Sequence, residues 1–173
     1  VPGLHKYCTC NDYASLYPSL MRQFNIGPET LVTMLPEKDE DIKQFNTYFI
    51  DLDCGKDKKG KYFDLDTVSE YKKKKLKELQ RFQPSPSAII QTRNGLQAYW
   101  FIRDVPTPSQ WRRIENYLVE KFNADVNVKN PSKQLRLPCT VWMKEGYPPF
   151  YCDILNLEHF YYTVLDFQHH IEE

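Results

Sequence analysis

Two apolar runs separated by Asn94-Gly95 constrain the fold of this chain more than any other feature of its sequence. The runs cover residues 88–93 and 96–103 and are rich in the aromatic and branched side chains that favour strands. Asn-Gly between two such runs is the strongest short signal of a tight turn, because both residues tolerate a positive φ. The sequence therefore predicts an antiparallel hairpin.

Helical patterns flank this hairpin on both sides. Before it, Thr67 and Glu70 have the spacing of a capping box, and apolar residues then recur near helical period until a proline ends the segment. After it, Thr107 and Gln110 have the same spacing, with Pro108 in the first turn. The expected apolar faces consist of Val68, Tyr71, Leu79 and Phe82 in the first helix and Trp111, Ile114, Leu118 and Phe122 in the second.

A buried strand is expected ahead of these elements, at residues 47–54 (TYFIDLDC). The region after the second helix holds short apolar segments broken by prolines, which indicate loops and one or two strands. The order strand, helix, hairpin, helix, strand is a split βαββαβ arrangement. It predicts an α+β fold with the first strand in the interior of an antiparallel sheet.

Length and composition fit one globular domain. The chain has 173 residues, enough for one sizeable core, and its 41% hydrophobic content argues against disorder. We expect residues 1–173 to form a single domain. Its core would cover about residues 46–167, after an N-terminal element at about residues 1–45 with a short helix near residues 16–25.

Charge and hydropathy narrow the possible partners. Lys and Arg (23) balance Asp and Glu (23), so any nucleic-acid binding has to come from a local basic face. No run approaches the ~20 apolar residues of a membrane span, and we expect a cytoplasmic protein without membrane partners. The odd number of cysteines indicates reduced thiols. His5, Cys8 and Cys10 could form part of a zinc site, although their spacing and the lack of a fourth ligand argue against it.

Asp51 and Asp53 are the first candidates for chemistry. Alternation along a strand sends both carboxylates to one face, ~7 Å apart, where they repel each other unless a cation lies between them. Mg²⁺ and Mn²⁺ are held in this way for phosphoryl chemistry. Such a pair is also common at solvated strand ends. A second pair, Asp64 and Asp66, is expected to lead into the next helix, whose dipole favours acids at its start.

Two further stretches carry polar candidates. Arg93, Asn94 and Gln97 are expected at the tip and on the face of the hairpin, where they could meet a triphosphate and a base or form only a turn. Asp125 is followed at wide spacing by cations that could bind phosphates or be ordinary surface residues. These cations are Lys133, Arg136 and Lys144.

Taken together, these stretches resemble the archaeo-eukaryotic primase (AEP) superfamily, in particular the primase-polymerases of plasmids, phages and mobile elements. The family pattern is a strand ending in Asp-x-Asp or Asp-x-Glu, a Gly-x-His-x-Tyr/Trp hairpin, and an Asp followed by Arg-Leu. Here the pattern reads Phe49-Ile-Asp-Leu-Asp53, Gly95-Leu-Gln-Ala-Tyr-Trp100, and Asp125 with Leu135-Arg-Leu-Pro138. The match keeps order and spacing over about residues 46–167.

The resemblance implies a template-directed nucleotidyl transferase, a DNA primase or primase-polymerase, with an RRM-like core. Asp51, Asp53 and Asp125 would be catalytic and would bind two Mg²⁺ or Mn²⁺ ions. Gln97 stands where the family has a nucleotide-contacting histidine. Contacts with the incoming NTP or dNTP would come from Arg93, Asn94, Gln97, Lys133, Arg136 and Lys144. A single-stranded DNA template, a primer, and a helicase or other replication protein would be the partners, in a prokaryotic cell.

A second resemblance concerns the N-terminal element. The segment Asp12-Tyr-Ala-Ser-Leu-Tyr-Pro-Ser19 is similar to the first catalytic motif of family B DNA polymerases, in which the Asp binds metal and the second Tyr screens the sugar. Asp12 and Tyr17 would have these roles. A helix start with Ser15 as its cap and Pro18 in its first turn explains the same residues. We favour the helix, because the chain lacks the other motifs of that family.

Two other functions are consistent with the sequence. A non-catalytic, RRM-like module that binds single-stranded nucleic acid would use Tyr99 and Phe101 as stacking platforms. An inactive fragment of a replication protein would keep the fold with an incomplete site, and Gln97 is the residue that favours this alternative.

Overall fold

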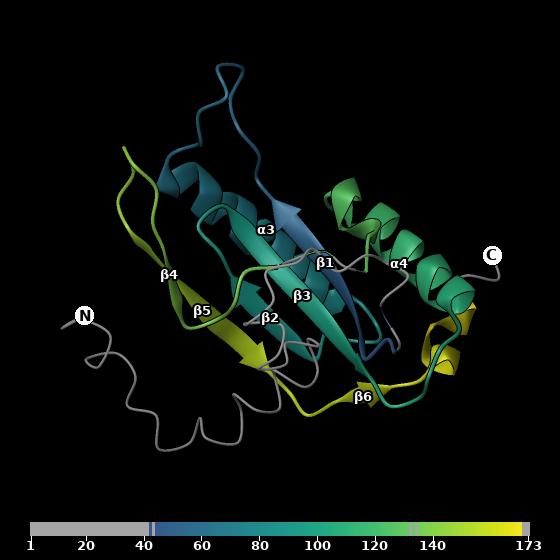
Figure 1. The fold of residues 1–173 in the computed structure, drawn as a ribbon. Coiled ribbons are helices and arrows are strands. Elements are labelled where there is room, and N and C mark those ends of the chain that lie inside the picture. Colours follow the sequence, from purple (N-terminus) through teal and green to yellow (C-terminus); the bar gives the residue numbers. More distant parts are fainter. Residues whose placement is uncertain (1–41, 43, 132, 134, 171–173) are drawn as a thin grey trace. The chain divides into compact units, whose positions relative to one another are not determined.

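A six-stranded sheet runs through the part of the chain that the computed structural model describes, which is residues 42, 44–131, 133 and 135–170. The order of its main path is β1-β3-β2-β5-β4, with antiparallel pairing, and β6 pairs in parallel with the end of β3 (Figure 1). The strands are β1 (Thr47–Asp53), β2 (Ala88–Gln91), β3 (Gly95–Ile102), β4 (Thr140–Trp142), β5 (Phe150–Leu157) and β6 (Tyr161–Tyr162).

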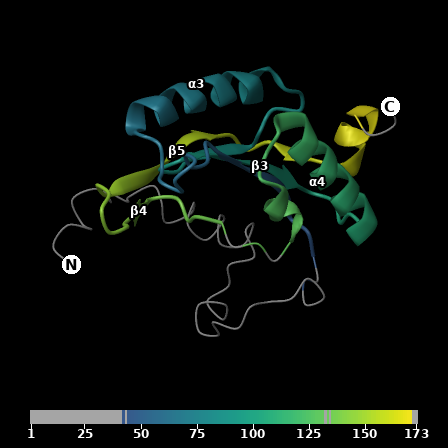
Figure 2. The same cartoon turned by 90° about the horizontal axis from the view of Figure 1, so that it is seen from above.

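Two α-helices pack on this sheet, and two short 3₁₀ helices follow them. They are α3 (Leu65–Arg81), α4 (Pro108–Phe122), η3 (Val126–Lys129) and η4 (Val164–His170). Figure 2 shows α3 lying over one face of the sheet, with α4 beside it. The Trp100 ring of β3 packs on this face, with its centroid 6.0 Å from that of Phe82 and 6.1 Å from that of Phe122. The predicted α+β class is confirmed.

The predicted hairpin is present, but its turn is centred one residue earlier than expected. Gln91 of β2 pairs with Leu96 of β3, and the Thr92 N–H donates to the Gly95 carbonyl oxygen at 2.9 Å. Neither Asn94 nor Gly95 has a positive φ, so the predicted Asn94-Gly95 turn is wrong. Glycine is required at position 95 for another reason, which is the close approach of β1. A Cβ on Gly95 would lie 2.7 Å from the Leu52 carbonyl carbon, so only glycine allows β1 to approach so closely.

The helix starts follow side-chain capping. For α4 the predicted capping box is confirmed, with Thr107 N–H donating to Gln110 Oε1 at 2.9 Å and Gln110 N–H donating to Thr107 Oγ1 at 3.3 Å. For α3 the predicted Thr67–Glu70 box is wrong. The cap is Asp64, whose Oδ1 accepts the Thr67 N–H at 2.8 Å. A carboxylate at this position also interacts with the positive end of the helix dipole.

Within the described residues β1 is an edge strand, because β3 is the strand with which it pairs there. The prediction that this strand lies in the interior of the sheet is therefore wrong. Of the strands that follow α4, β5 pairs with β2 and β4 pairs with β5, on the side of the sheet opposite β1, while β6 pairs with the end of β3. The described residues just before β4 lie across β3 (Figure 1), where the main chain of Arg136 meets the side chain of Gln97.

The outer edge of β1 is covered by α4 and the residues after it. Trp111 Nε1 donates to the Thr47 carbonyl oxygen at 2.9 Å, and the Phe49 N–H donates to Glu115 Oε2 at 3.3 Å. Burial raises the pKa of Glu115 well above its ordinary value. These side chains satisfy main-chain groups that an edge strand would otherwise leave unpaired, which explains why no additional strand is required here.

Some expectations concern residues outside the described ranges. They are the N-terminal element with its helix near residues 16–25, the zinc candidates His5, Cys8 and Cys10, and the polymerase-like Asp12 and Tyr17. These expectations, and that of a single domain, stay predictions. None of the described helices combines the length and the apolar character that crossing a bilayer requires. Cys54 and Cys152 carry free thiols, as expected.

Candidate active site

Two carboxylates lie at the end of β1, on the face opposite Trp100. Asp51 is opposite Gln97 of β3, and Asp53 is opposite Gly95, so both follow the alternation that the sequence predicts. Asp51 is half-buried and Asp53 is exposed. Asp53 Oδ1 accepts the Gly55 N–H at 2.6 Å, which fixes one of its oxygens at the start of the following loop.

A third carboxylate, Asp125, is held beside this pair by a main-chain hydrogen bond. The Asp125 N–H donates to the Asp51 carbonyl oxygen at 2.9 Å, on the outer edge of β1. Asp125 is also the N-cap of η3, where its Oδ1 accepts the N–H of Asn127 at 2.9 Å and the side-chain amide of the same residue at 2.8 Å. Asp125, which follows α4 and is far from Asp51 in the sequence, thus lies at the end of β1.

The charges of the other two predicted acids and of two predicted cations act on the Asp51 carboxyl group. Burial, followed by the charges of Asp53 and Asp125, raises the pKa of Asp51 to about 6. The positive charges of Lys133 and Arg136 act in the opposite direction. The three carboxylates repel one another, and the two cations offset this repulsion only in part.

These carboxylates have the right chemistry for a divalent cation but do not form a closed coordination shell. In residues 42, 44–131, 133 and 135–170, no three His, Cys, Asp or Glu side chains are arranged to hold a metal ion. One oxygen of Asp53 and one of Asp125 are engaged in local turns. Carboxylate oxygens are nevertheless the donors that Mg²⁺ and Mn²⁺ take, and a cation would relieve the repulsion around Asp51.

We expect Asp51→Asn to stabilise the protein near pH ~8 but not near pH ~3.5. The pKa of this carboxyl group rises from 3.8 to about 6 on folding, so between these values the folded state keeps a proton that the unfolded state has released. Stability therefore falls as the pH rises from 3.8 to about 6, and above about 6 the loss is complete, at most ~3 kcal/mol, since one pKa unit corresponds to ~1.36 kcal/mol. The asparagine variant escapes this loss.

The measurement is the melting temperature of both proteins at the two pH values, with a chelator present. Asp66→Asn is the matched control, because Asp66 is exposed in the first turn of α3 and should give no gain at either pH. Equal melting temperatures of wild type and Asp51→Asn at the higher pH would contradict the repulsion described above.

Gln97 is on the same face as Asp51, but it is only 3% exposed. In the orientation that satisfies both ends of its amide, it donates to the Tyr99 hydroxyl at 3.0 Å and to the Arg136 carbonyl oxygen at 3.1 Å. It also accepts the Arg136 N–H at 3.2 Å. This geometry does not support the expected nucleotide contact of Gln97. The side chain instead fastens the crossing segment that carries Arg136 onto β3.

Gln97→Ala should lower the free energy of unfolding by ~2–4 kcal/mol, because it leaves buried partners without hydrogen bonds and creates a cavity. The same change at Gln80, which is exposed on α3, should stay within ~0.5 kcal/mol. Denaturant unfolding of the two variants measures both quantities. A loss at position 97 as small as that at position 80 would show that Gln97 does not hold the segment.

Arg93 lies at the hairpin tip, as predicted, but is buried in a group of aromatic rings. Its guanidinium carbon is 5.4 Å from the centroid of Tyr62 and 5.5 Å from that of Tyr147, and its Nη1 donates to Asn94 Oδ1 at 2.7 Å. Lys144 Nζ is 4.8 Å from the centroid of Tyr62. The structure thus brings Arg93, Asn94 and Lys144 together. Tyr62 was not among the residues predicted for the site, although an aromatic pair, Tyr62-Phe63, directly follows the lysine tract.

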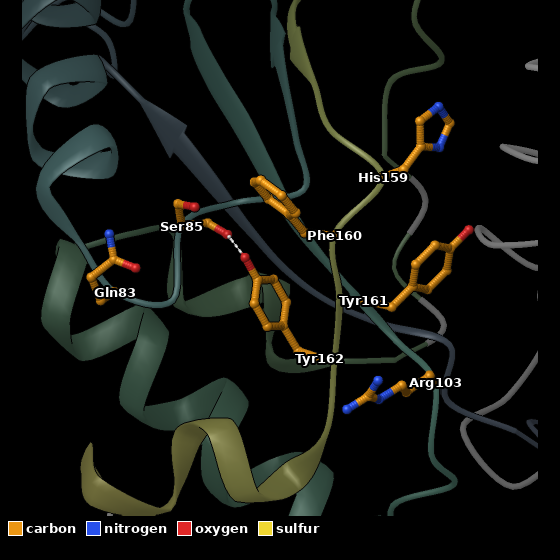
Figure 3. A pocket seen from close by; sticks show the side chains of 7 residues that line it. All are labelled: Gln83, Ser85, Arg103, His159, Phe160, Tyr161 and Tyr162. Carbon is orange, nitrogen blue, oxygen red and sulfur yellow. Dashed lines mark hydrogen bonds between the residues drawn. The ribbon is translucent and has the colours of Figure 1, made fainter.

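A pocket elsewhere on the described surface contains none of the predicted site residues. It lies beside β6 and has a volume of about 490 Å³ (Figure 3). Tyr162 lines this pocket, and the Tyr162 hydroxyl donates to the Ser85 carbonyl oxygen at 2.6 Å. The lining residues are Gln83, Ser85, Arg103, His159, Phe160, Tyr161 and Tyr162. Because β6 pairs with the end of β3 opposite to Gly95, this pocket is remote from Asp51 and Asp53.

No family model matches this chain. A "Replication protein" of Clostridium perfringens is 30% identical over 110 residues, which are 59% of this chain and 25% of that protein. The AEP domain of the cyanophage S-2L primase-polymerase superposes with a TM-score of 0.55 and 18% identity, over 78% of this chain and 64% of that domain.

The expected resemblance is confirmed at the level of fold. The described sheet and helices are similar to those of an AEP primase-polymerase domain. The chain spans about a quarter of the length of the replication protein that it matches and just under two thirds of the solved domain.

Proposed function

We propose that this chain, whose fold is that of an AEP domain, catalyses template-directed nucleotidyl transfer as part of a DNA primase or primase-polymerase. The observation that carries the proposal is the hydrogen bond from the Asp125 N–H to the Asp51 carbonyl oxygen. It brings a third acid to the end of β1, beside a pair of acids that is already on one face. Asp51 and Asp125 are half-buried and Asp53 is exposed. Three carboxylates that repel one another in one place are what a site for divalent cations requires.

In this proposal Asp51, Asp53 and Asp125 hold two Mg²⁺ or Mn²⁺ ions. When bound, such ions lower the charge on the attacking 3′ oxygen and on the departing pyrophosphate. Lys133 and Arg136 are exposed, and their positive charges act to lower the pKa of Asp51. In this proposal they contact the phosphates of an incoming NTP or dNTP. Gln97 contributes by fixing the segment that carries Arg136.

Three further residues belong to the proposed nucleotide site. Arg93 and Lys144 supply positive charge next to the end of β1, where the Cys54 N–H donates to the Asn94 carbonyl oxygen at 3.0 Å. Burial, followed by the charge of Asp53, raises the pKa of the Cys54 thiol, and the charge of Arg93 acts in the opposite direction. Arg93, Asn94 and Lys144 therefore flank the nucleotide's phosphates in this proposal.

The partners belong to the same proposal. A template-directed enzyme requires a single-stranded template and a primer, and a chain that covers a quarter of a replication protein leaves room in such a protein for a helicase or other part. Tyr99 and Phe101, the stacking platforms of the binding-module alternative, are 1% and 2% exposed and cannot stack on bases in this structure. An inactive fragment is the remaining alternative.

The test is nucleotide incorporation. The purified chain is incubated with a single-stranded template, labelled nucleotides and Mn²⁺ or Mg²⁺, with and without a primer. We expect labelled product whose base composition follows the template. Folded protein that gives no product under any of these conditions would favour the inactive fragment and contradict the proposal.

A further inference from the structure

A lysine-rich arm joins β1 to α3 and is itself folded. Lys56 and Tyr62 form an antiparallel bridge, and the Asp57 N–H donates to the Lys61 carbonyl oxygen at 2.9 Å. Gly60 closes the tip with a φ of +75°, a conformation that favours glycine. Figure 1 shows this arm, residues 54–64, extending past the end of β1. Because its shape is fixed by its own hydrogen bonds, a ligand would not have to order it.

The arm carries a net positive charge, because its four lysines outnumber its two acids, Asp57 and Asp64. Its lysines are exposed, and none of them makes an ion pair with a described residue; they are Lys56, Lys58, Lys59 and Lys61. Asp57, which lies between Lys56 and Lys58, accepts the main-chain N–H groups of Lys59 and Lys61 through its Oδ1, at 2.9 and 2.8 Å. That carboxylate stabilises the turn, while the side chains of Lys58, Lys59 and Lys61 remain exposed.

The base of the arm gathers further cations around one ring. Lys56 Nζ is 5.0 Å from the Tyr62 ring centroid, in addition to Lys144 at 4.8 Å and the Arg93 guanidinium carbon at 5.4 Å. Arg93 is 5% exposed, and its buried Nε has no hydrogen-bond partner. Three cations around one aromatic ring repel one another, and a buried donor without a partner is costly. Both features point to an anion at this end of the sheet.

We infer that the arm binds the sugar-phosphate backbone of a single-stranded nucleic acid and leads it to the end of β1. A single small anion would engage only the cluster around Tyr62. Successive exposed lysines along a preformed arm instead fit a ligand with regularly repeated negative charges. The inference rests on the proposed function in one respect, because it identifies the bound strand as the template or primer.

Two variants with equal loss of charge test this inference. The arm variant is Lys58→Gln/Lys59→Gln/Lys61→Gln, which leaves the Tyr62 cluster intact. The control is Lys73→Gln/Lys74→Gln/Lys77→Gln, which removes three exposed lysines from α3. Fluorescence anisotropy measures binding of a labelled ~20-nucleotide oligothymidylate between ~50 and ~200 mM salt, without nucleotide or divalent metal.

We expect the slope of log K against log salt concentration to become less steep by ~2 in the arm variant, since each lost contact with a single strand removes ~0.7. Affinity at the lowest salt concentration should fall at least ~10-fold. The control should keep the wild-type slope, and both variants should keep the wild-type melting temperature. Equal losses in the two variants would mean a general charge effect and would overturn the inference, as would an unchanged arm variant.

Two more measurements distinguish a nucleic-acid backbone from a dNTP as the ligand of the arm. They also distinguish failure of the inference about the arm from failure of the proposed function. Affinity for a dNTP with Ca²⁺ should be unchanged in the arm variant; loss of dNTP affinity with intact DNA affinity would assign the arm to the triphosphate and overturn the inference. Asp51→Asn/Asp53→Asn should bind DNA with the wild-type slope. If the wild type incorporates no nucleotide but the arm effect is present, the proposed function fails while the inference stands.

Discussion

Asp51→Asn/Asp53→Asn is expected to lose nucleotide incorporation by at least ~1,000-fold while the protein stays folded. Stabilisation of transition-state charge by bound metal ions contributes several kcal/mol, and each ~1.36 kcal/mol corresponds to a factor of ten in rate. The amides keep the shape of the side chains but not the charge that holds the cations. The fold should survive, because Asp51 is destabilised by its surroundings when charged and Asp53 is exposed.

The matched control for this variant is Asp66→Asn/Glu70→Gln, which removes two exposed acids from α3 and should leave incorporation unchanged. Primer extension with Mn²⁺ measures the activity. In parallel, Mn²⁺ should raise the melting temperature of the wild type but not that of the double variant, because only a folded state that binds the ion is stabilised. Wild-type incorporation by the double variant would exclude these acids from the catalysis.

Gly95→Ala should destabilise the protein by more than ~4 kcal/mol or prevent folding, the largest effect expected of any single methyl group here. The added Cβ would lie 2.7 Å from the Leu52 carbonyl carbon and 3.1 Å from the Asp53 Cα. Both atoms belong to the main chain of β1, so no side chain can move aside. Relief of the clash would require β1 to separate from β3 at the position that carries Asp53.

Gly146→Ala is the appropriate comparison for this change. Gly146 has a φ of +79° and nothing within 4 Å of a Cβ, so its substitution should cost only ~1 kcal/mol of backbone strain. Thermal unfolding of both variants gives the difference. A Gly95→Ala protein with the stability of the Gly146→Ala protein would show that the two strands do not approach each other as closely as described.

Local rules account for the parts of the fold that the sequence predicted correctly. The capping box of Thr107 and Gln110 depends on atoms three residues apart, and the shared face of Asp51 and Asp53 follows from alternation within one strand. The same kind of rule failed where two local options competed. At the start of α3, Asp64 caps the helix in place of Thr67, because a charged acceptor interacts with the dipole as well as with the N–H.

Local sequence patterns thus specify the set of elements, the α+β class, and the acid pair on one face of a strand. The neighbours of these elements depend on tertiary packing. Asp125 reaches Asp51 because Trp111 and Glu115 of α4 satisfy the outer main-chain groups of β1. Gln97 bonds the Arg136 main chain because the described residues just before β4 lie across β3. Pairings of this kind depend on hydrogen bonds and burial between residues far apart in sequence, whose free energies no local pattern records.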